Sequence, residues 1–542
     1  MEEAAYLRRQ LGDAFVYWIL GDLDDELSPQ QVDVALTISA MLRKGISDQP
    51  GIPIGLVAKS LVFYRAEWGT TSINHFRQHA AQAQPTSYAR SGDQLLDSLI
   101  DLAIEGYGEM LLPTYPFDSD LDWGHYFRTS EGRNVVAAMR NEGGFLFAAD
   151  DNAAESEAEG PFNDIHRSFE PLLYACRIIN AAWGLAKLKA SVPSLDELVD
   201  KLPDTLSGAR SLLRGESTQI IAVSSFTGIR LPEGTEIVGN WGRIRAARAE
   251  DHPSLLKPML ERRTMTTTDA GEHVEITDAG DVIFEARIAM KMRINRDADQ
   301  MSWSTSTRED IPGQVDRVRL AFALAIRRDA WPVLIPTWHK IIMPLIGNGP
   351  SSYSDPQSMA SRVPILLSLD EIASWESWID VVMAADLRQL NLAITRTLRA
   401  QTERRDRSDA LIDAVIAWES LFGAITESTL RVSASLARLL HAAGAERELA
   451  RSRYSKIYER RSKIVHGART KTTAEQIDED SRTAIYVVLE VIRVLLTKRS
   501  DLLPLESAER SMRILMQDHQ FTAQEEIPSI LPAGESPQET GS

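Results

Sequence analysis

The sequence contains one cysteine in 542 residues. Cys176 therefore cannot form a disulfide within the chain, which favours a cytoplasmic setting, and its small and apolar neighbours predict a buried, unreactive thiol. There is no run of about eighteen apolar residues, so no membrane-spanning helix is expected. Residues 1–9 lack the basic start and apolar core of a secretion signal. We therefore expect a cytoplasmic protein that does not engage a membrane.

Sequence signatures of nucleotide and metal sites are also missing. The glycine-containing segments 239–242 and 347–352 match neither a Walker loop nor a dinucleotide fingerprint, and we interpret both as turns. His75 and His79 have the i, i+4 spacing of a helical metal site, but no Glu, Cys or third His stands nearby to complete it. A solvated helix face is the favoured interpretation of this pair. No cofactor and no metal ion are expected.

The charge of the chain is unevenly distributed. The net charge is −18, which argues against a chain that coats nucleic acid along its whole length. Residues 381–499 contain 21 Lys and Arg against 15 Asp and Glu, a net charge of +6, so the remainder carries −24. This asymmetry indicates an anionic partner for the basic segment, although a helical bundle with a surface of mixed sign explains the charge equally well.

Residues 1–165 are predicted to form a helical N-terminal region. Ser28 before Pro29 is a helix start signal, and residues 95–104 have the pattern of an amphipathic helix. The region ends in an acidic loop at 150–160, which is too polar to pack. Helical spacing is already present near the start of the chain, at Leu7, Leu11, Phe15, Trp18 and Ile19.

Residues 166–335 change periodicity and predict a β-containing domain. After a helix at 172–188, apolar and polar residues alternate with the period of two that is typical of a half-buried strand. Residues 278–281 supply a hairpin turn. We interpret the predicted strands as one antiparallel sheet that acts as a sensing or substrate surface. They are 220–223, 229–237 (broken at 232–234), 284–294 and 318–326, the last with alanines that also permit a helix.

Residues 336–380 contain repeated prolines and predict an irregular connection, and residues 381–500 predict an all-helical bundle. Ser408 is expected to cap the second helix of the bundle, and Gly423 and Gly444 are expected stops. Residues 501–542 are expected to hold a short helix and a disordered tail. The expected bundle helices are 378–403, 408–422, 427–443, 445–465 and 474–497.

The fourth of these helices carries an arginine and a histidine, Arg461 and His466, just before Gly467. RNA supplies its own nucleophile in the 2′-hydroxyl, so a protein that cleaves it needs only to move protons and to stabilise charge on the phosphate. Histidine titrates near neutral pH, and arginine stays charged and binds phosphate oxygens with two parallel N–H groups. The pair is therefore a candidate ribonuclease site.

The hexapeptide Arg461-Ser-Lys-Ile-Val-His466 resembles the R-x4-6-H signature of the HEPN superfamily. Together with the Trp-Glu-Ser-Leu-Phe helix at 418–422 and a last long helix, it is most similar to the Apea-like HEPN branch. The resemblance spans about residues 381–499. It implies an all-α bundle, a metal-independent ribonuclease of a toxin or antiviral defence system, and a homodimer with a composite site. Ser462 departs from the Asn, Asp or His that many active members carry after the arginine.

Neighbouring residues bear on this site. Arg461 and His466 lie about 140° apart on a helix, so convergence requires their long or planar side chains to meet at a groove edge. Ser462, at i−4 to the histidine, can orient the imidazole, and Arg460 is an alternative phosphate ligand. Glu419 lies in an apolar helix, and we expect it to form an ion pair with Arg461 or Arg460.

The sequence thus predicts a multidomain α+β protein: a helical N-terminal region, a middle antiparallel β-containing domain and a C-terminal HEPN bundle. Arg461 and His466 are the predicted catalytic residues, RNA the predicted substrate, and a protein or phage-derived molecule the predicted trigger at the N-terminal regions. In the alternative, the bundle is a non-catalytic scaffold that binds RNA, nucleotide or a partner protein. Arg461 would then be a salt-bridge partner of an acid and His466 a cation at the end of a helix.

Overall fold

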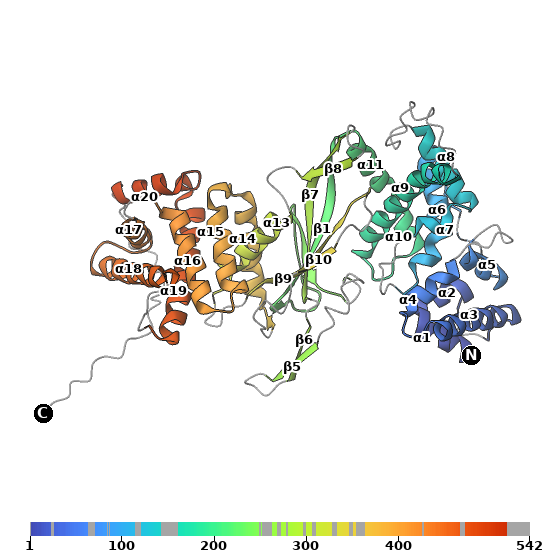
Figure 1. Cartoon of the computed structure of the whole chain (residues 1–542), viewed down its shortest axis with the longest axis horizontal. Coiled ribbons are helices and arrows are strands. Elements are labelled where there is room, and N and C mark those ends of the chain that lie inside the picture. Colours follow the sequence, from blue (N-terminus) through green and yellow to red (C-terminus); the bar gives the residue numbers. More distant parts are fainter. Residues whose placement is uncertain are drawn as a thin grey trace. The chain divides into compact units, whose positions relative to one another are not determined.

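The computed structural model shows a mixed α+β protein that is mostly helical, with an antiparallel sheet in the middle of the sequence (Figure 1). The chain divides into two compact units. Unit 1 comprises Met1–Val318, Arg328–Gln357 and Ser361–Glu376, and unit 2 comprises Arg319–Arg327, Ser358–Ala360 and Ser377–Ser542. The residues described are 2–22, 26–62, 71–83, 85, 87–113, 121–142, 161–248, 251, 263–267, 273–277, 280–295, 300–305, 311–327, 333–345, 351–353, 364–424, 428–466 and 472–517.

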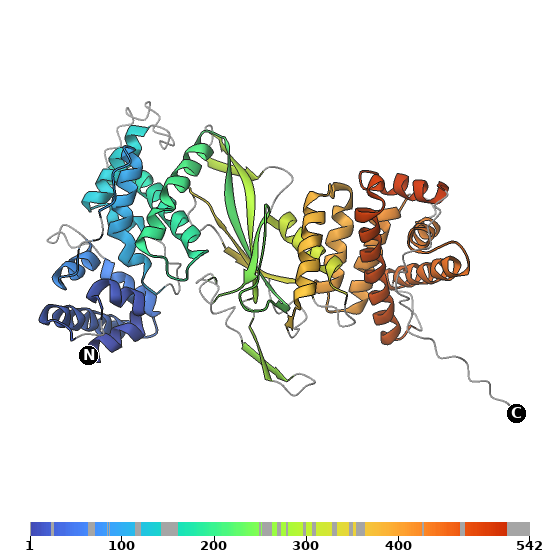
Figure 2. The ribbon, with the colours of Figure 1, turned by 180° about the vertical axis from the view of Figure 1, so that it is seen from behind.

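The N-terminal part of unit 1 is helical, as predicted (Figure 2). The start signal before α3 is confirmed: the Ser28 hydroxyl accepts the N–H of Gln31, whose side chain in turn accepts the N–H of Ser28, and Pro29 occupies the first helical position. The acidic loop at 150–160 lies outside the described residues. The helices are α1 (Glu2–Leu11), α2 (Asp13–Leu20), α3 (Pro29–Asp48), α4 (Ile54–Lys59), α5 (Ser72–His79), α6 (Gln94–Met110), α7 (Trp123–Tyr126) and α8 (Ser130–Glu142).

A long helix, α9 (Pro161–Lys187), leads to α10 (Leu195–Val199) and α11 (Leu202–Leu213), which precede the sheet. Cys176 lies on α9 and is buried, as expected. Burial raises the pKa of its thiol well above the ordinary value, so the sulfur stays protonated and unreactive.

The predicted sheet is present and antiparallel. Its strand order is β10-β9-β1-β7-β4-β3, and β8 pairs with β7. The 14-residue strand β7 corresponds to the alternating pattern at 284–294, and it pairs with β1 from Ser217↔Lys291 to Phe226↔Val282. The strands are β1 (Ser217–Thr227), β3 (Glu236–Gly239), β4 (Gly242–Ala246), β7 (Val282–Asn295), β8 (Gln300–Thr305), β9 (Ile335–Ile342) and β10 (Ser351–Tyr353).

Shorter strands and turns complete this part of the chain. β2 (Ile229–Arg230) pairs in parallel with β11 (Ile365–Leu366), and β5 (Arg263–Thr267) pairs with β6 (His273–Thr277). The turn prediction for residues 239–242 is confirmed, because Asn240 and Trp241 connect β3 to β4. Residues 347–350 of the second glycine segment and residues 278–279 of the expected hairpin turn lie outside the described residues.

Two predictions are wrong in this region. Residues 318–326 belong largely to a helix, α13 (Ile311–Ala325), because alanines between the larger apolar residues let it bury a wide face. Residues 336–342, expected in an irregular connection, belong to β9 (Ile335–Ile342) inside the sheet, with Pro336 at a register irregularity of the β1–β9 pair. The same connection holds the start of a further helix, α14 (Leu369–Ala384).

Helix α9 packs on one face of the sheet. Ala181 of α9 forms an apolar cluster with Val223, Ile283, Trp338 and Ile342, which come from β1, β7 and β9. The helix therefore buries the sheet residues on one side of these three strands, and the hydrophobic effect provides the main driving force for this contact.

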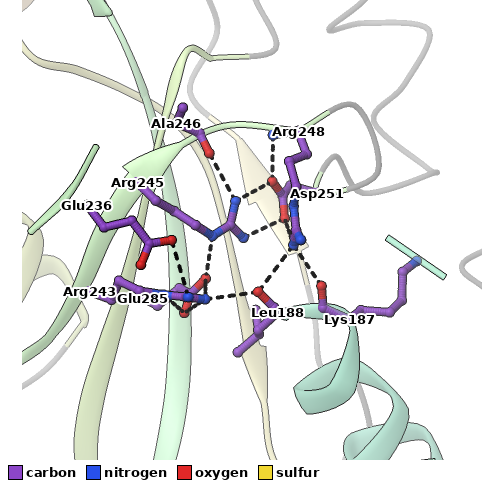
Figure 3. A network of polar contacts seen from close by, with 9 residues as sticks. All are labelled: Lys187, Leu188, Glu236, Arg243, Arg245, Ala246, Arg248, Asp251 and Glu285. Atoms are coloured by element: carbon purple, nitrogen blue, oxygen red, sulfur yellow. Dashed lines mark hydrogen bonds and ion pairs between the residues drawn. The ribbon is translucent and has the colours of Figure 1, made fainter. Parts of the chain in front are cut away.

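A polar network connects the C-terminal end of α9 to the sheet (Figure 3). Glu285 of β7 accepts hydrogen bonds from the Nε atoms of Arg243 (3.0 Å) and Arg245 (2.8 Å), both on β4. Arg245 also forms a two-bond pair with Asp251, at 2.7 Å for each bond. Arg243 donates to the carbonyl oxygen of Leu188 (2.9 Å), just after α9 ends. The network is a structural link between the helix and the two strands, and its buried charges are paired.

The stability of unit 1 is expected to decrease at low pH because of Asp251. Burial opposes ionisation of this carboxyl, but hydrogen bonds and charge from Arg245, with further bonds from Arg248, hold its pKa well below the ordinary range. An unfolded Asp takes up a proton below about pH 3.9, whereas the folded one stays ionised, so acid favours unfolding. The melting-temperature advantage of wild type over Asp251→Asn should therefore be largest above about pH 5 and narrow as the pH falls below about 4. Thermal unfolding across that pH range measures it, and a constant difference would contradict the assignment.

Unit 2 contains the predicted helical bundle. The prediction for the fourth and fifth helices is confirmed in its bounds, the first expected helix is broken into several pieces, and the N-cap of α16 is Asp406 rather than Ser408. Glu427 lies outside the described residues. The elements are α15 (Asn391–Leu398), a π-helix (Arg399–Glu403), α16 (Arg407–Phe422), α17 (Ser428–Leu440), α18 (Ala445–Val465), α19 (Ala474–Thr497) and α20 (Ser507–Met516).

The core of unit 2 is centred on α16. Trp418 is completely buried, and its indole N–H donates to the carbonyl oxygen of Ala484 on α19 at 3.0 Å. Gly423 ends α16, as predicted, with its N–H bonded to the carbonyl oxygen of Glu419 at 2.6 Å. The expected short helix after the bundle is α20, and the expected tail beyond residue 517 lies outside the described residues.

The described part of the chain contains no helix long and apolar enough to cross a membrane.

Candidate active site

Helix α18 positions the arginine and the histidine. Tyr454, Ile457 and Tyr458 are its buried residues, at the i, i+3 and i+4 spacing of one helix face. The next position in this series is Arg461, whose side chain is 19% exposed. Arg461 therefore lies on the inner face of α18, next to α16.

The inner end of the site is a three-residue cluster of Glu419, Tyr458 and Arg461. Glu419 lies in the last turn of α16, and its Oε2 accepts a hydrogen bond from Nη2 of Arg461 at 3.2 Å. Its Oε1 accepts a hydrogen bond from the hydroxyl of Tyr458. The expected ion pair between Glu419 and an arginine of this helix is thus present, and Arg461 is the partner.

Tyr458 contributes a contact that sequence reasoning missed. Burial and the hydrogen bond to the Glu419 carboxylate raise the pKa of this phenol to about 12, so it remains a donor at neutral pH. A carboxylate that accepts bonds from both a phenol and a guanidinium is fixed in orientation, and it fixes the arginine in turn. The available signal was the spacing of three residues between Tyr458 and Arg461, which places both on one face.

Arg460 points to a different partner. Its Nη1 forms an ion pair with Asp480 of α19. Burial raises the pKa of Asp480 above its ordinary value, against the opposing effect of the Arg460 charge. Consecutive residues of a helix lie about 100° apart, which explains why two adjacent arginines bind acids on two different helices.

His466 lies at the C-terminal end of α18, away from the inner face that carries Arg461. It is exposed and forms the C-cap of α18, with its N–H bonded to the carbonyl oxygen of Ser462 at 3.1 Å. This backbone bond is the contact that the structure gives between His466 and Ser462; it is not made by the serine hydroxyl. Gly467, the expected helix stop, lies outside the described residues.

The structure thus brings together Arg461, Glu419 and Tyr458, and it separates His466 from them. Arg461 faces α16, whereas His466 is exposed to solvent at the end of α18. The Nε of Arg461 is a buried donor with no hydrogen-bond partner among the described residues, a property that it shares with the Nε atoms of other arginines, among them Arg248 and Arg396.

The other candidate residues from the sequence do not form a site. His79 pairs with Asp33, whose Oδ2 lies 3.0 Å from its Nε2, at the surface of the N-terminal helices. No group of three His, Cys, Asp or Glu side chains suited to a metal ion occurs within the described ranges. His79 is exposed to solvent, whereas His75 is half-buried with its ring against Phe76.

Comparison with known proteins leaves the family open: no family model matches the chain, and no similarity was detected to a curated protein or to a solved structure.

Proposed function

We propose that residues 381–500 form a HEPN-type bundle that acts as a metal-independent endoribonuclease, the effector of a toxin or antiviral defence system. The N-terminal helical region, 1–165, and the β-containing domain, 166–335, would detect a protein or phage-derived trigger. Three features support this proposal: the R-x4-H sequence on α18, the helical surroundings of that sequence, and the Arg461 guanidinium, which is bonded to Glu419 and has an Nε without a partner among the described residues.

The proposed reaction uses the 2′-hydroxyl of RNA as nucleophile. His466 accepts the proton of this hydroxyl or donates a proton to the leaving 5′-oxygen, depending on its protonation state. The bond from the 2′-oxygen to phosphorus forms as the bond to the 5′-oxygen breaks, which leaves a 2′,3′-cyclic phosphate and a 5′-hydroxyl. Arg461 stabilises the additional charge on the pentavalent phosphate.

The orientation of Arg461, which Glu419 and Tyr458 hold on the inner face of α18, is the observation that carries this proposal. An arginine has five N–H groups, and the ion pair with Glu419 uses one of them, on Nη2. The Nε–H group is buried and has no acceptor in the part of the chain that the structure describes. A phosphate oxygen is the acceptor that a guanidinium binds best, and Glu419 with Tyr458 would hold the side chain ready for it.

The position of His466 explains why the proposal includes a homodimer. Arg461 and His466 of one chain lie on different sides of α18, and in-line cleavage requires a base and an acid on opposite sides of the phosphorus. A two-fold axis beside the end of α18 would add a second His466 and a second Arg461 without any further sequence. The two bundles would then share one site.

A second candidate function is a non-catalytic scaffold that binds RNA, nucleotide or a partner protein. It is favoured by the same ion pair: Arg461 bonded to Glu419, and His466 on another face, are sufficient to explain both residues as parts of the bundle. The two functions differ in one measurable outcome, the production of RNA fragments with cyclic phosphate ends.

Cleavage of RNA should persist in excess EDTA. The chemistry proposed for Arg461 and His466 uses a proton-transfer group and a fixed cation, so it requires no divalent ion. The measurement is digestion of a labelled single-stranded RNA by the full-length chain with EDTA present, with fragment ends identified by mass spectrometry.

Two results would contradict the proposal. Cleavage that disappears with EDTA and returns with Mg²⁺ or Mn²⁺ would indicate a different, metal-dependent site. Fragments with 3′-hydroxyl ends would exclude the 2′-hydroxyl as nucleophile. Binding of the RNA without any cleavage would favour the scaffold.

A further inference from the structure

The cations of α18 fall into two groups. Seven Lys and Arg residues lie between Ala445 and Val465, against three Glu. All five arginines are bonded within the protein. Their contacts are Arg447 Nε to the carbonyl oxygen of His441 (3.0 Å), Arg451 to Glu448 (3.2 Å), Arg453 to Glu479 (3.0 Å), Arg460 to Asp480, and Arg461 to Glu419 (3.2 Å).

The two lysines behave differently. Lys456 and Lys463 are both exposed, and neither has a hydrogen-bond or ion-pair partner among the described residues. The arginines thus connect α18 to the rest of the bundle, and the lysines are available to a ligand. Lysine suits this role because its ammonium is a compact charge on a flexible stem.

The lysines share a face with the exposed histidine. Seven residues are nearly two turns, so Lys456 and Lys463 lie about 20° apart around the helix axis and about 10 Å apart along it. His466 follows Lys463 by three residues, about 4.5 Å further along the axis. One side of α18 therefore carries two ammonium groups that are unpaired within the described residues, and His466 follows them along the helix axis. We call Lys456, Lys463 and His466 the lysine track.

One acid lies on the same face between the two lysines. Glu459 is exposed, and it stands three residues after Lys456 and four before Lys463. At these spacings a carboxylate can neutralise either lysine in part. It should therefore weaken the binding of an anion. Removing this charge should strengthen binding, whereas removing a lysine should weaken it.

We infer that the lysine track binds the phosphate backbone of single-stranded RNA and leads it to His466. This inference rests on the proposed function, because the track ends at the residue assigned to proton transfer. A single strand is favoured over a duplex because flexible lysines on one helix face can follow a backbone of irregular spacing. The face carries no aromatic residue on which bases stack, so the contacts are expected to be independent of sequence.

Binding through this track should be sensitive to salt in a defined way. Each phosphate neutralised on a single strand contributes about 0.7 to the slope of log affinity against log salt concentration. The single variants Lys456→Ala and Lys463→Ala should each lower the slope by about 0.7 and weaken binding about fivefold at 0.1 M salt. The double variant should lower the slope by about 1.4 and weaken binding about 25-fold. Glu459→Gln should tighten binding.

The experiment uses the full-length chain and a fluorescent single-stranded RNA with 2′-O-methyl groups, which cannot be cleaved by 2′-hydroxyl attack. Fluorescence anisotropy gives the affinity at several salt concentrations. The control is Lys44→Ala, which removes an exposed helical lysine from α3 in unit 1 and should leave affinity and slope unchanged. Far-UV circular dichroism checks that each variant is folded.

The outcomes separate the track from the ribonuclease. Binding that changes as expected, without cleavage of the unmodified RNA, supports the track and overturns the proposed catalysis. Cleavage by wild type together with unchanged affinity and salt slope in both lysine variants overturns the track and leaves the ribonuclease intact. Displacement of the RNA by polyglutamate at equal charge concentration would overturn the choice of RNA and indicate an acidic protein as the ligand.

Discussion

Replacement of His466 by alanine is expected to remove RNA cleavage while leaving the fold intact. A positioned general acid or base typically accelerates a reaction by about 10²–10⁴, so a loss of at least 100-fold is expected. The fold should tolerate the change because the side chain is exposed and the residue's contact with α18 is made by its backbone N–H. The expected variant is therefore a folded protein with very low activity.

The measurement is the initial rate of cleavage of a labelled RNA by wild type and His466→Ala at equal concentration. His79→Ala is the matched control, because it removes a partly exposed imidazole, 52% exposed, from a helix of unit 1. The melting temperatures of all three proteins should agree. Cleavage at the wild-type rate by His466→Ala would remove this histidine from the mechanism and leave the scaffold function as the better account of α18.

Replacement of Glu285 by alanine is expected to destabilise unit 1 by about 3–5 kcal/mol. Glu285 is 8% exposed and bonds to both Arg243 and Arg245, whose side chains are 24% and 6% exposed. In the variant, Arg245 remains almost completely buried and keeps Asp251 as its only acidic partner in the network of Figure 3. Arg243 loses its closest acid. The loss should exceed that of any single surface ion pair, which contributes about 0–1 kcal/mol.

Urea unfolding of the full-length chain, followed by far-UV circular dichroism, measures this loss in the transition of unit 1. Glu236→Ala is the control within the same network, since Glu236 is 44% exposed and lies 3.5 Å from Arg243. Its effect should remain within about 1 kcal/mol. Equal losses of free energy of unfolding for the two substitutions would contradict this prediction. They would show that the buried ion pairs of Glu285 in Figure 3 stabilise unit 1 no more than an exposed ion pair does.

The sequence by itself determined the elements with strong local signals. The bounds of α18 and α19 could be predicted because apolar residues recur at helical spacing within each segment. The role of Gly444 was predicted wrongly: it was the expected stop of the preceding helix, but α17 ends at Leu440 and Gly444 is the N-cap of α18. The strand β7 could be predicted because apolar residues alternate with charged ones over many residues. Where alanines alternate with larger apolar residues, as in α13, the same pattern fits a buried helix, and only packing decides.

The tertiary structure decided which charged residues meet. Arg460 and Arg461 are neighbours in the sequence, yet one bonds to Asp480 and the other to Glu419, because they point to different helices. Tyr458 became part of the site only through its bond to Glu419, a residue 39 positions away. Local periodicity can place a side chain on a helix face, but the partner of that face comes from a distant part of the chain, and no local signal specifies it.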